Sequence, residues 1–445
     1  MATIASEITT NRSRSISHIK QSTIFAVFII APFFIDQIQG YIILELSSNF
    51  PFSVLFKLAY LSTYFIFLLK YNKLNYVIAS LGLIFIMSLS MLSSIDSASQ
   101  ITRNVSSLAK LLYFPITFFF FRSFFSRNNY NEAFIYRIFN FLFWALFIVI
   151  LASIFGIGSS QYGETEDGVS IGFSGYFFAG NELGPLAVML YAYVLNYKIY
   201  TKSKVWKLLL TFSIGLTTCF LTATKVAIGG FIIMTLLIPF YMNITQSLTK
   251  IKSTILVFYG ALFSGGLAII GIFVFTFREN LLAYFNQLMF LFERADSLLA
   301  FLASGRDQRV EGAIDIYIDQ YNWFEKLFGT GDWYMQPLAA SLNKPHLEFV
   351  SAEIDPLDLI LRVGLIGCSA LLLIWFYYAY LSFKVSLIAK SSFFSAPFLI
   401  TSFFLATSFS AGHIVSSSLL GFYLAIILAF TFSEYKKRQV EKLND

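Results

Sequence analysis

Residues 133–156 read AFIYRIFNFLFWALFIVILASIFG, a run of 24 residues in which Arg137, near the start, carries the only charge. At a rise of 1.5 Å per residue, a helix of this length covers about 36 Å, enough to cross a hydrocarbon core of about 30 Å. The backbone of a spanning segment must satisfy its hydrogen bonds internally, because no water is available inside a bilayer. The run therefore predicts a transmembrane helix.

Similar runs recur along the whole chain. Its 445 residues are 57% hydrophobic and 13% charged, whereas soluble domains carry about 25% charged residues. We predict an all-α, polytopic integral membrane protein in which residues 1–445 form a single transmembrane domain. The expected spans number twelve, at about 22–46, 52–69, 76–95, 106–125, 133–156, 177–197, 205–221, 226–242, 253–277, 355–382, 393–411 and 413–433.

Lysine and arginine clusters between the spans indicate the orientation. Every cluster falls on the side of the N-terminal tail and of the basic C-terminal end, whereas the opposite connections are acidic or polar. The positive-inside rule assigns the basic side to the cytoplasm, so both termini are expected there. The net charge of +6 then reflects topology. It does not predict a nucleic-acid partner, because the basic residues form short separate clusters instead of one stripe.

One long connection, residues 278–354, is expected to form a large outer loop between spans nine and ten. Its first part, 278–304, suits an amphipathic helix at the interface. Ser304-Gly305-Arg306-Asp307 has the spacing of a capping box that opens a helix through about Gln320. Gly329-Thr330-Gly331 predicts a turn.

Charged side chains near the outer ends of spans are candidate functional residues, because burial of charge at membrane depth is costly. They are Arg103, Lys225, Arg306, Arg309, Glu353, Asp355, Asp358, Arg362 and His413. Arg306 and Arg309 lie one turn apart, an arrangement that suits bidentate binding of a phosphate or pyrophosphate. The alternatives are a solvated face paired with Glu311 and Asp315, and for Lys225 a lysine that snorkels to the interface.

The stretch from Glu353 to Asp358 opens the tenth span and has a structural interpretation. Asp355 is expected as the N-cap, Pro356 as the first helical residue and Asp358 as its capping-box partner, with Arg362 one turn beyond Asp358 as a possible ion-pair partner. Glu353 has no capping role, which makes it the better candidate for a general base. His413, at the turn between the last two spans, is either a site residue or a packing residue.

Several classes of site are not indicated. No set of His, Asp or Glu has metal-ligand spacing outside the capping stretch, so we expect no metal. Neither a Walker A loop nor a dinucleotide fingerprint is present, so we expect no cofactor. Cys219 and Cys368 lie singly inside apolar runs and are expected to pack in the core.

From about residue 172 to its end, the chain resembles the O-antigen polymerase and O-antigen ligase superfamily of bacterial envelope enzymes. The patches that carry the resemblance are Gly175–Gly184 with its Asn181, Thr222–Ala227, Ser304-Gly305-Arg306, Leu327–Gly331 and Glu353–Gly367 with its Gly-x-x-Gly. Where ligases place a histidine eleven residues before the first of these glycines, this chain has Glu353 before Gly364. This departure favours a polymerase. Lys225 stands where ligases usually carry an arginine.

The resemblance implies a fold similar to GT-C-type glycosyltransferases and an inverting, metal-independent polymerase in the bacterial inner membrane. Such an enzyme transfers a glycan from undecaprenyl pyrophosphate to another lipid-linked repeat unit on the periplasmic face, sometimes with a chain-length regulator as partner. Glu353 is then the expected base, and Arg306, Arg309 and Lys225 are expected to bind the pyrophosphate. Asp355, His413, Arg103 and Arg362 are further candidates. A ligase that delivers the glycan to lipid A core and a lipid-linked oligosaccharide flippase are the alternatives.

Overall fold

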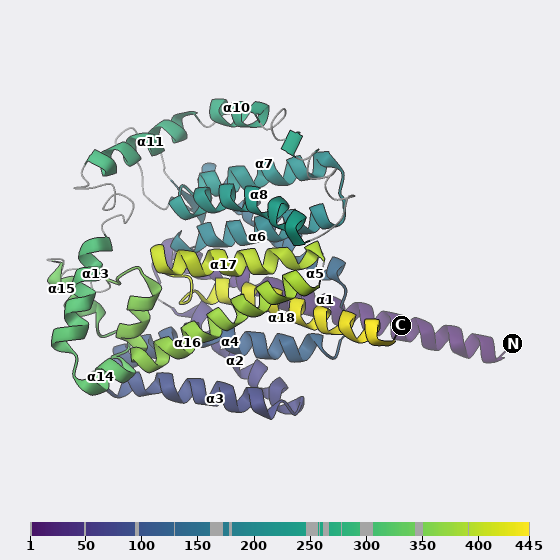
Figure 1. The fold of residues 1–445 in the computed structure, drawn as a ribbon, viewed down its shortest axis with the longest axis horizontal. Helices are drawn as coiled ribbons and strands as arrows, with labels where there is room; N and C mark the ends of the chain where they lie inside the picture. Colours follow the sequence, from purple (N-terminus) through teal and green to yellow (C-terminus); the bar gives the residue numbers. More distant parts are fainter. Residues whose placement is uncertain are drawn as a thin grey trace.

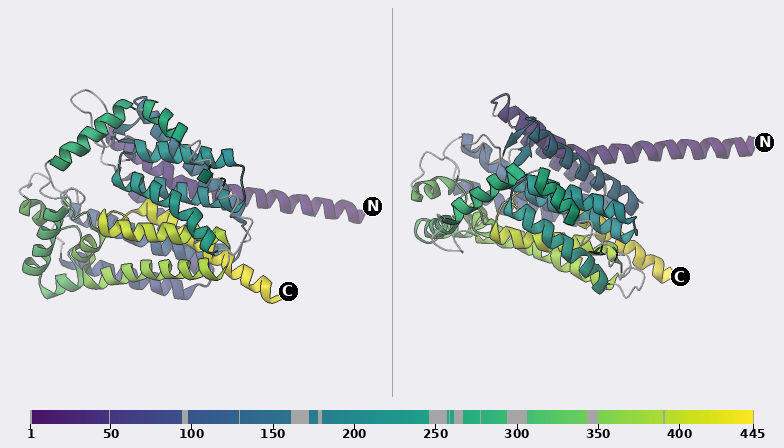
Figure 2. Two further views of the ribbon diagram at one scale, coloured as in Figure 1. Left: turned by 45° about the horizontal axis from the view of Figure 1, so that its top comes forward. Right: turned by 90° about the horizontal axis from the view of Figure 1, so that it is seen from above.

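The computed structural model describes residues 2–444 except for 49, 94–97, 129, 161–171, 178–179, 246–256, 258, 261–266, 277, 294–305, 343–349 and 390. Most of the long helices run side by side along one common direction (Figure 1). The N-terminal part of α1 and the end of α18 project at one end of this bundle, and α13, α14 and α15 lie at the other (Figures 1 and 2). We call the end that carries α13 to α15 the outer end.

The bundle is built from eleven helices among the described residues, and the longest connection between two of them runs from α8 to α16. They are α1 (Ala2–Leu44), α2 (Phe52–Lys70), α3 (Leu74–Ser88), α4 (Ala98–Phe125), α5 (Glu132–Ile154), α6 (Gly180–Tyr200), α7 (Val205–Leu221), α8 (Lys225–Thr245), α16 (Asp355–Ile388), α17 (Ser395–Ser410) and α18 (Ser418–Asn444). Short 3₁₀ helices, η1 (Leu89–Ser93) and η4 (Ser392–Phe394), extend α3 and precede α17. Strands β1 (Ser159–Ser160) and β2 (Phe173–Gly175) pair antiparallel after α5.

The structure and the hydropathy pattern agree on the fold class. Within the described residues, nine helices are long and apolar enough to cross a membrane. Most of their bounds lie within a few residues of the predicted ones, but the fourth span begins at Gln100 instead of 106 and the last runs from Ser418 to Glu441 instead of 413–433. The apolar helix α7 is shorter, and its bounds are the predicted ones. Most of the span predicted at 253–277 lies outside the described residues. The all-α polytopic fold is therefore confirmed, whereas the count of twelve spans stays a prediction.

Helix α18 lies at the centre of the bundle and packs along α4. In the most apolar window of each helix, 89% of the α18 residues and 72% of the α4 residues are buried. Gly421 of α18 faces the β-carbon of Phe114, and a small residue at such a crossing allows two helices to approach closely. Aromatic rings fill the adjoining space, including Phe114 stacked on Trp375 with ring centroids 4.5 Å apart.

The outer segment has a small core of its own. It contains α13 (Arg306–Asp315), a π-helical turn (Ile316–Gln320), α14 (Trp323–Phe328) and α15 (Met335–Ser341). The predicted helix thus begins at Arg306 and ends at Gln320, while Ser304 and Gly305 of the predicted capping box lie outside the described residues. Before this segment come α10 (Leu267–Thr276) and α11 (Arg278–Glu293), so a helix forms in the first part of the loop.

The outer segment is joined to α16 at Gly364, where the helix is interrupted. Gly364 has φ 68° and ψ −179°, and a β-carbon there would lie 2.2 Å from the carbonyl oxygen of Leu327. Only glycine accommodates both the left-handed φ and this close approach. The predicted turn at Gly329–Gly331 is present and donates hydrogen bonds from Thr330 and Gly331 to the carbonyl oxygens of Leu361 and Arg362. The interruption therefore leaves the first turns of α16 as a short outer section that holds the loop.

Candidate functional site

Glu353, Arg306 and Arg309 meet at the outer end of the bundle. Oε2 of Glu353 lies 3.2 Å from Nε of Arg306, and its Oε1 is paired with Nη1 of Arg309. The three side chains are 23%, 16% and 27% exposed, respectively. They are thus enclosed enough to interact strongly and open enough to be reached from outside. We call these three residues, together with Lys225, the outer cluster.

Glu353 is positioned by close packing between its own turn and the turn before α18. A β-carbon at Gly412 would lie 2.4 Å from the carbonyl oxygen of Glu353, so the turn before α18 rests directly on the Glu353 backbone. Glu353 has φ 58° and His413 has φ 59°. Left-handed backbone at residues other than glycine costs of order 1 kcal/mol and persists only where the surroundings hold it. Such strain is often found at functional sites, which favours this one.

Lys225 belongs to the outer cluster through its interaction with Arg306. It is the first residue of α8, its side chain is exposed, and the Arg306 charge acts on it electrostatically. Ala223, two residues earlier, has φ 52° and forms the turn that presents it. A β-carbon at Gly184 of α6 would lie 2.4 Å from Oγ1 of Thr224, so the start of α6 packs against this turn. The cluster therefore combines three positive side chains with one carboxylate.

The charges of the cluster hold Glu353 in its ionised form. Burial alone would raise the pKa of Glu353, but the guanidinium groups of Arg309 and Arg306 outweigh burial and hold the pKa below its usual value of 4.5. Burial lowers the pKa of His413 below its usual 6.5, although the carboxylates of Asp358 and Glu353 act in the opposite direction. At neutral pH the site therefore contains an ionised, doubly paired Glu353 beside a neutral His413.

The predicted helix cap at the start of α16 is wrong in its details. The residue before the helix is Ile354, and no side-chain cap is present. Oδ2 of Asp355 instead accepts hydrogen bonds from the backbone N–H groups of Ile414 and Val415, at 2.8 and 2.9 Å. Asp358 accepts from the N–H of Ala352 and from the hydroxyl of Tyr334. The two carboxylates thus tie α16 to neighbouring segments instead of capping it.

Arg362 also has a partner that the sequence spacing did not indicate. Its Nε lies 2.6 Å from Oδ1 of Asp332 in the outer segment, and Tyr334 links it to Asp358. Asp332 also accepts from the hydroxyl of Ser107 on α4. This buried network joins the outer segment to two bundle helices, which gives Arg362 a structural role. Asp332 directly follows the Gly329–Gly331 turn. This position was the one feature of the sequence that could have indicated its role.

Arg103 lies near the outer end of α4, one turn before Ser107, and is half-buried. Its place at the outer end agrees with the prediction, and its role stays a prediction. Among the residues that the structure describes, no group of three or more His, Cys, Asp or Glu side chains could share a metal ion. The metal-free reaction likewise stays a prediction.

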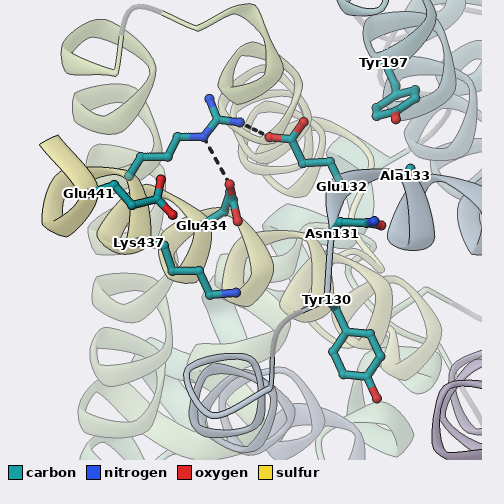
Figure 3. Close-up of a pocket in the computed structure, with 9 residues that line it drawn as sticks. Tyr130, Asn131, Glu132, Ala133, Tyr197, Glu434, Lys437 and Glu441 are labelled. Carbon is teal, nitrogen blue, oxygen red and sulfur yellow. Dashed lines mark hydrogen bonds and ion pairs between the residues drawn. The ribbon is translucent and has the colours of Figure 1, made fainter. Parts of the chain in front are cut away.

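A polar pocket of about 530 Å³ lies at the opposite end of the bundle, between the start of α5 and the end of α18 (Figure 3). There Arg438 pairs with Glu132 and Glu434, and Lys437 and Glu441 also line the pocket. Positive and negative side chains are mixed and already paired. This pocket is therefore better suited to hold helix ends together than to bind an anion.

The fold and the outer cluster together define a multi-pass membrane protein with a cationic site and a carboxylate at one end of its helical bundle. The chain belongs to the family described as O-antigen ligase like membrane protein, whose model matches residues 18–280. A comparison with curated proteins gave no match. Family membership supports an O-antigen-related function in the membrane and, at a coarse level, a glycosyltransferase-like activity.

The family model matches only part of the residues that form the outer cluster. It includes the first two resembling patches, at 175–184 and 222–227, and ends before the patches at 304–306, 327–331 and 353–367. Lys225 therefore lies in the matched region, whereas Arg306, Arg309 and Glu353 lie beyond it. The roles of these three residues rest on their geometry and on the resemblance alone.

Proposed function

We propose that the protein is a polysaccharide polymerase that transfers a growing glycan from undecaprenyl pyrophosphate to a lipid-linked repeat unit. The observation that carries the proposal is the outer cluster, in which two arginines pair with one carboxylate and Lys225 interacts electrostatically with Arg306. A pyrophosphate leaving group needs the positive charge, and an acceptor hydroxyl needs a base. Glu353 at the position where ligases place a histidine favours a polymerase.

In the proposed reaction, the oxygen of the acceptor hydroxyl attacks the anomeric carbon of the donor glycan. The bond between that carbon and the pyrophosphate oxygen breaks, and its electron pair leaves with the pyrophosphate. Arg306, Arg309 and Lys225 stabilise the negative charge that develops there, while Glu353 takes the proton of the acceptor hydroxyl. Attack from the side opposite the leaving group inverts the configuration at that carbon.

The ion pairs of Glu353 suggest how substrate binding activates the base. Without substrate, Glu353 occupies both arginines and its pKa is held low, so it is a weak base. A bound pyrophosphate competes for the same guanidinium groups, because arginine pairs well with phosphate oxygens. Once the arginines turn to the phosphates, the partly buried carboxylate loses its partners and its pKa rises. The proton acceptor thus becomes effective only when the donor is bound.

The proposed location is the bacterial inner membrane, with both termini in the cytoplasm and the outer cluster on the periplasmic side. The positive-inside pattern of the sequence supports this orientation. The common end at which both termini lie in the structure is consistent with it (Figure 1). Lipid-linked oligosaccharides and membrane lipid are the proposed partners, and a chain-length regulator protein is a further one.

A ligase that transfers the glycan to lipid A core is the second candidate, because the matching family is described as O-antigen ligase like. The glycan profile of a deletion strain separates the two. A polymerase deletion leaves lipid A core capped with single repeat units, whereas a ligase deletion leaves uncapped core together with intact lipid-linked polymer. Repeat units trapped on the cytoplasmic leaflet would instead indicate a flippase and would contradict both enzyme assignments.

A further inference from the structure

Lys110 is a charged residue in the middle of a buried helix. It follows Ala98, the first residue of α4, by twelve positions, which places it about 18 Å along the helix axis. Ala109, Leu111, Leu112 and Tyr113 beside it are buried, yet the Lys110 side chain is exposed to solvent. An ionisable residue at such a depth usually faces a water-filled space and marks a site.

Charged side chains of several other elements act on Lys110. The charges that act on Lys110 come from Glu182 of α6, Lys57 of α2, Arg362 of α16 and Asp332 of the outer segment. These four elements are different from α4 and from one another. An accessible ammonium on which charges from four other elements act has polar protein groups around it, which lipid does not provide.

Two of the neighbouring cations already have partners. Nζ of Lys57 lies 2.9 Å from Oδ1 of Asp36, and Arg362 is paired with Asp332. Within the described part of the chain, no hydrogen bond or ion pair holds the Lys110 ammonium. Oε2 of Glu182 accepts one hydrogen bond from the hydroxyl of Ser417, whose Oγ lies 2.7 Å away. Lys110 and Glu182 thus provide one ammonium and one carboxylate whose bonding capacity is only partly used.

Lys110 and Glu182, which we call the inner pair, are linked to the outer cluster through the turn before α18. Ser417, which bonds Glu182, follows His413 by four residues, and His413 interacts electrostatically with Glu353. The turn before α18 thus contacts both groups. The outer cluster has an excess of positive charge and suits a diphosphate, whereas Lys110 and Glu182 balance one another and suit a neutral ligand with many hydroxyl groups.

We propose that Lys110, Glu182 and Ser417 form a binding site for the sugar portion of the lipid-linked substrate, with the diphosphate in the outer cluster. The ammonium donates hydrogen bonds to sugar oxygens, and the carboxylate accepts them from sugar hydroxyl groups. This inference rests on the proposed function, because it assigns the two parts of a glycan diphosphate to two adjacent sites. It makes Lys110 and Glu182 determinants of sugar binding and not of leaving-group binding.

Two natural probes separate the sites. One is the lipid-linked glycan that a deletion strain accumulates, and the other is undecaprenyl pyrophosphate without sugar. Binding of each to the full-length protein in detergent is measured by microscale thermophoresis. Lys110→Met and Glu182→Gln are expected to weaken binding of the glycan-bearing lipid by about tenfold each, the loss of a charged hydrogen bond, and to leave sugar-free lipid binding unchanged. That unchanged binding also shows that the variants are folded.

Lys70→Met, at the far end of α2, is the matched control and should affect neither probe. Arg306→Gln combined with Arg309→Gln should weaken both. If Lys110→Met and Glu182→Gln leave binding of the glycan-bearing lipid unchanged, or weaken both probes equally, the inner sugar site is refuted while the outer cluster stands. If the double arginine variant binds both lipids as the parent does, the proposed function itself fails.

Discussion

At the residue scale, Glu353 and its two arginines account for the pH dependence that we expect. The pKa of Glu353 is held below 4.5 in the substrate-free protein, so the carboxylate is ionised at all higher pH. Because kcat/KM reports the free enzyme, its value should stay constant from about pH 8 down to about pH 5 and fall only at lower pH. Glycan transfer by protein in liposomes, followed over that range, gives the profile.

A variant with His413→Gln is the appropriate background for this profile, because His413 lies beside Glu353 and its pKa also lies below 6.5. If the variant retains activity with the same flat profile, the assignment of Glu353 as the general base is supported. A loss of kcat/KM that begins above pH 6 in this background would be inconsistent with a base whose pKa is lowered by two arginines.

The chemistry of single residues was partly predictable from the sequence. Arg306, Arg309 and Glu353 stood out because their types and spacing suit a diphosphate and a base, and the structure brings these three side chains together. For Arg362 the spacing offered only Asp358, within its own helix, as a possible partner, because spacing shows only local neighbours. Its actual partner, Asp332, comes from the outer segment and meets it through the tertiary fold.

At the scale of elements, the interruption of α16 at Gly364 decides how the outer segment is held. Gly364→Ala introduces a β-carbon 2.2 Å from the Leu327 carbonyl oxygen at a φ of 68°. We expect this variant to release the outer segment, with faster limited proteolysis within residues 306–342 and a loss of glycan transfer. Gly229→Ala in α8 is the control, since nothing lies within 4 Å of the added carbon. Proteolysis of Gly364→Ala at the parent rate would contradict this role.

Hydropathy predicted the helices well because each span must be apolar over a length that the bilayer sets. It did not predict the interruption of α16 or the use of Asp355 and Asp358. Local rules assign a carboxylate near a helix start to a cap, whereas here both carboxylates bond other segments. A left-handed glycine inside an apolar run has no hydropathy signal. Such features depend on which segments meet in three dimensions.

At the scale of the whole molecule, the orientation in the membrane is testable by cysteine labelling. Glu311→Cys on α13 should react with a membrane-impermeant thiol reagent in intact spheroplasts, whereas Lys442→Cys near the end of α18 should react only after lysis. The native Cys219 and Cys368 are buried and serve as the background. Reaction of Lys442→Cys in intact spheroplasts would contradict this orientation. It would mean that the outer cluster lies on the cytoplasmic side.

The central claim is that Glu353 takes the proton in a glycan transfer whose leaving group the arginines hold. The most direct test is elongation of lipid-linked repeat units by the reconstituted protein with Glu353→Gln. The account predicts a rate about 10² to 10⁴-fold lower than that of the parent, with binding of undecaprenyl pyrophosphate retained or tightened because the competing carboxylate is gone. A full polymer ladder from Glu353→Gln at the parent rate would contradict it.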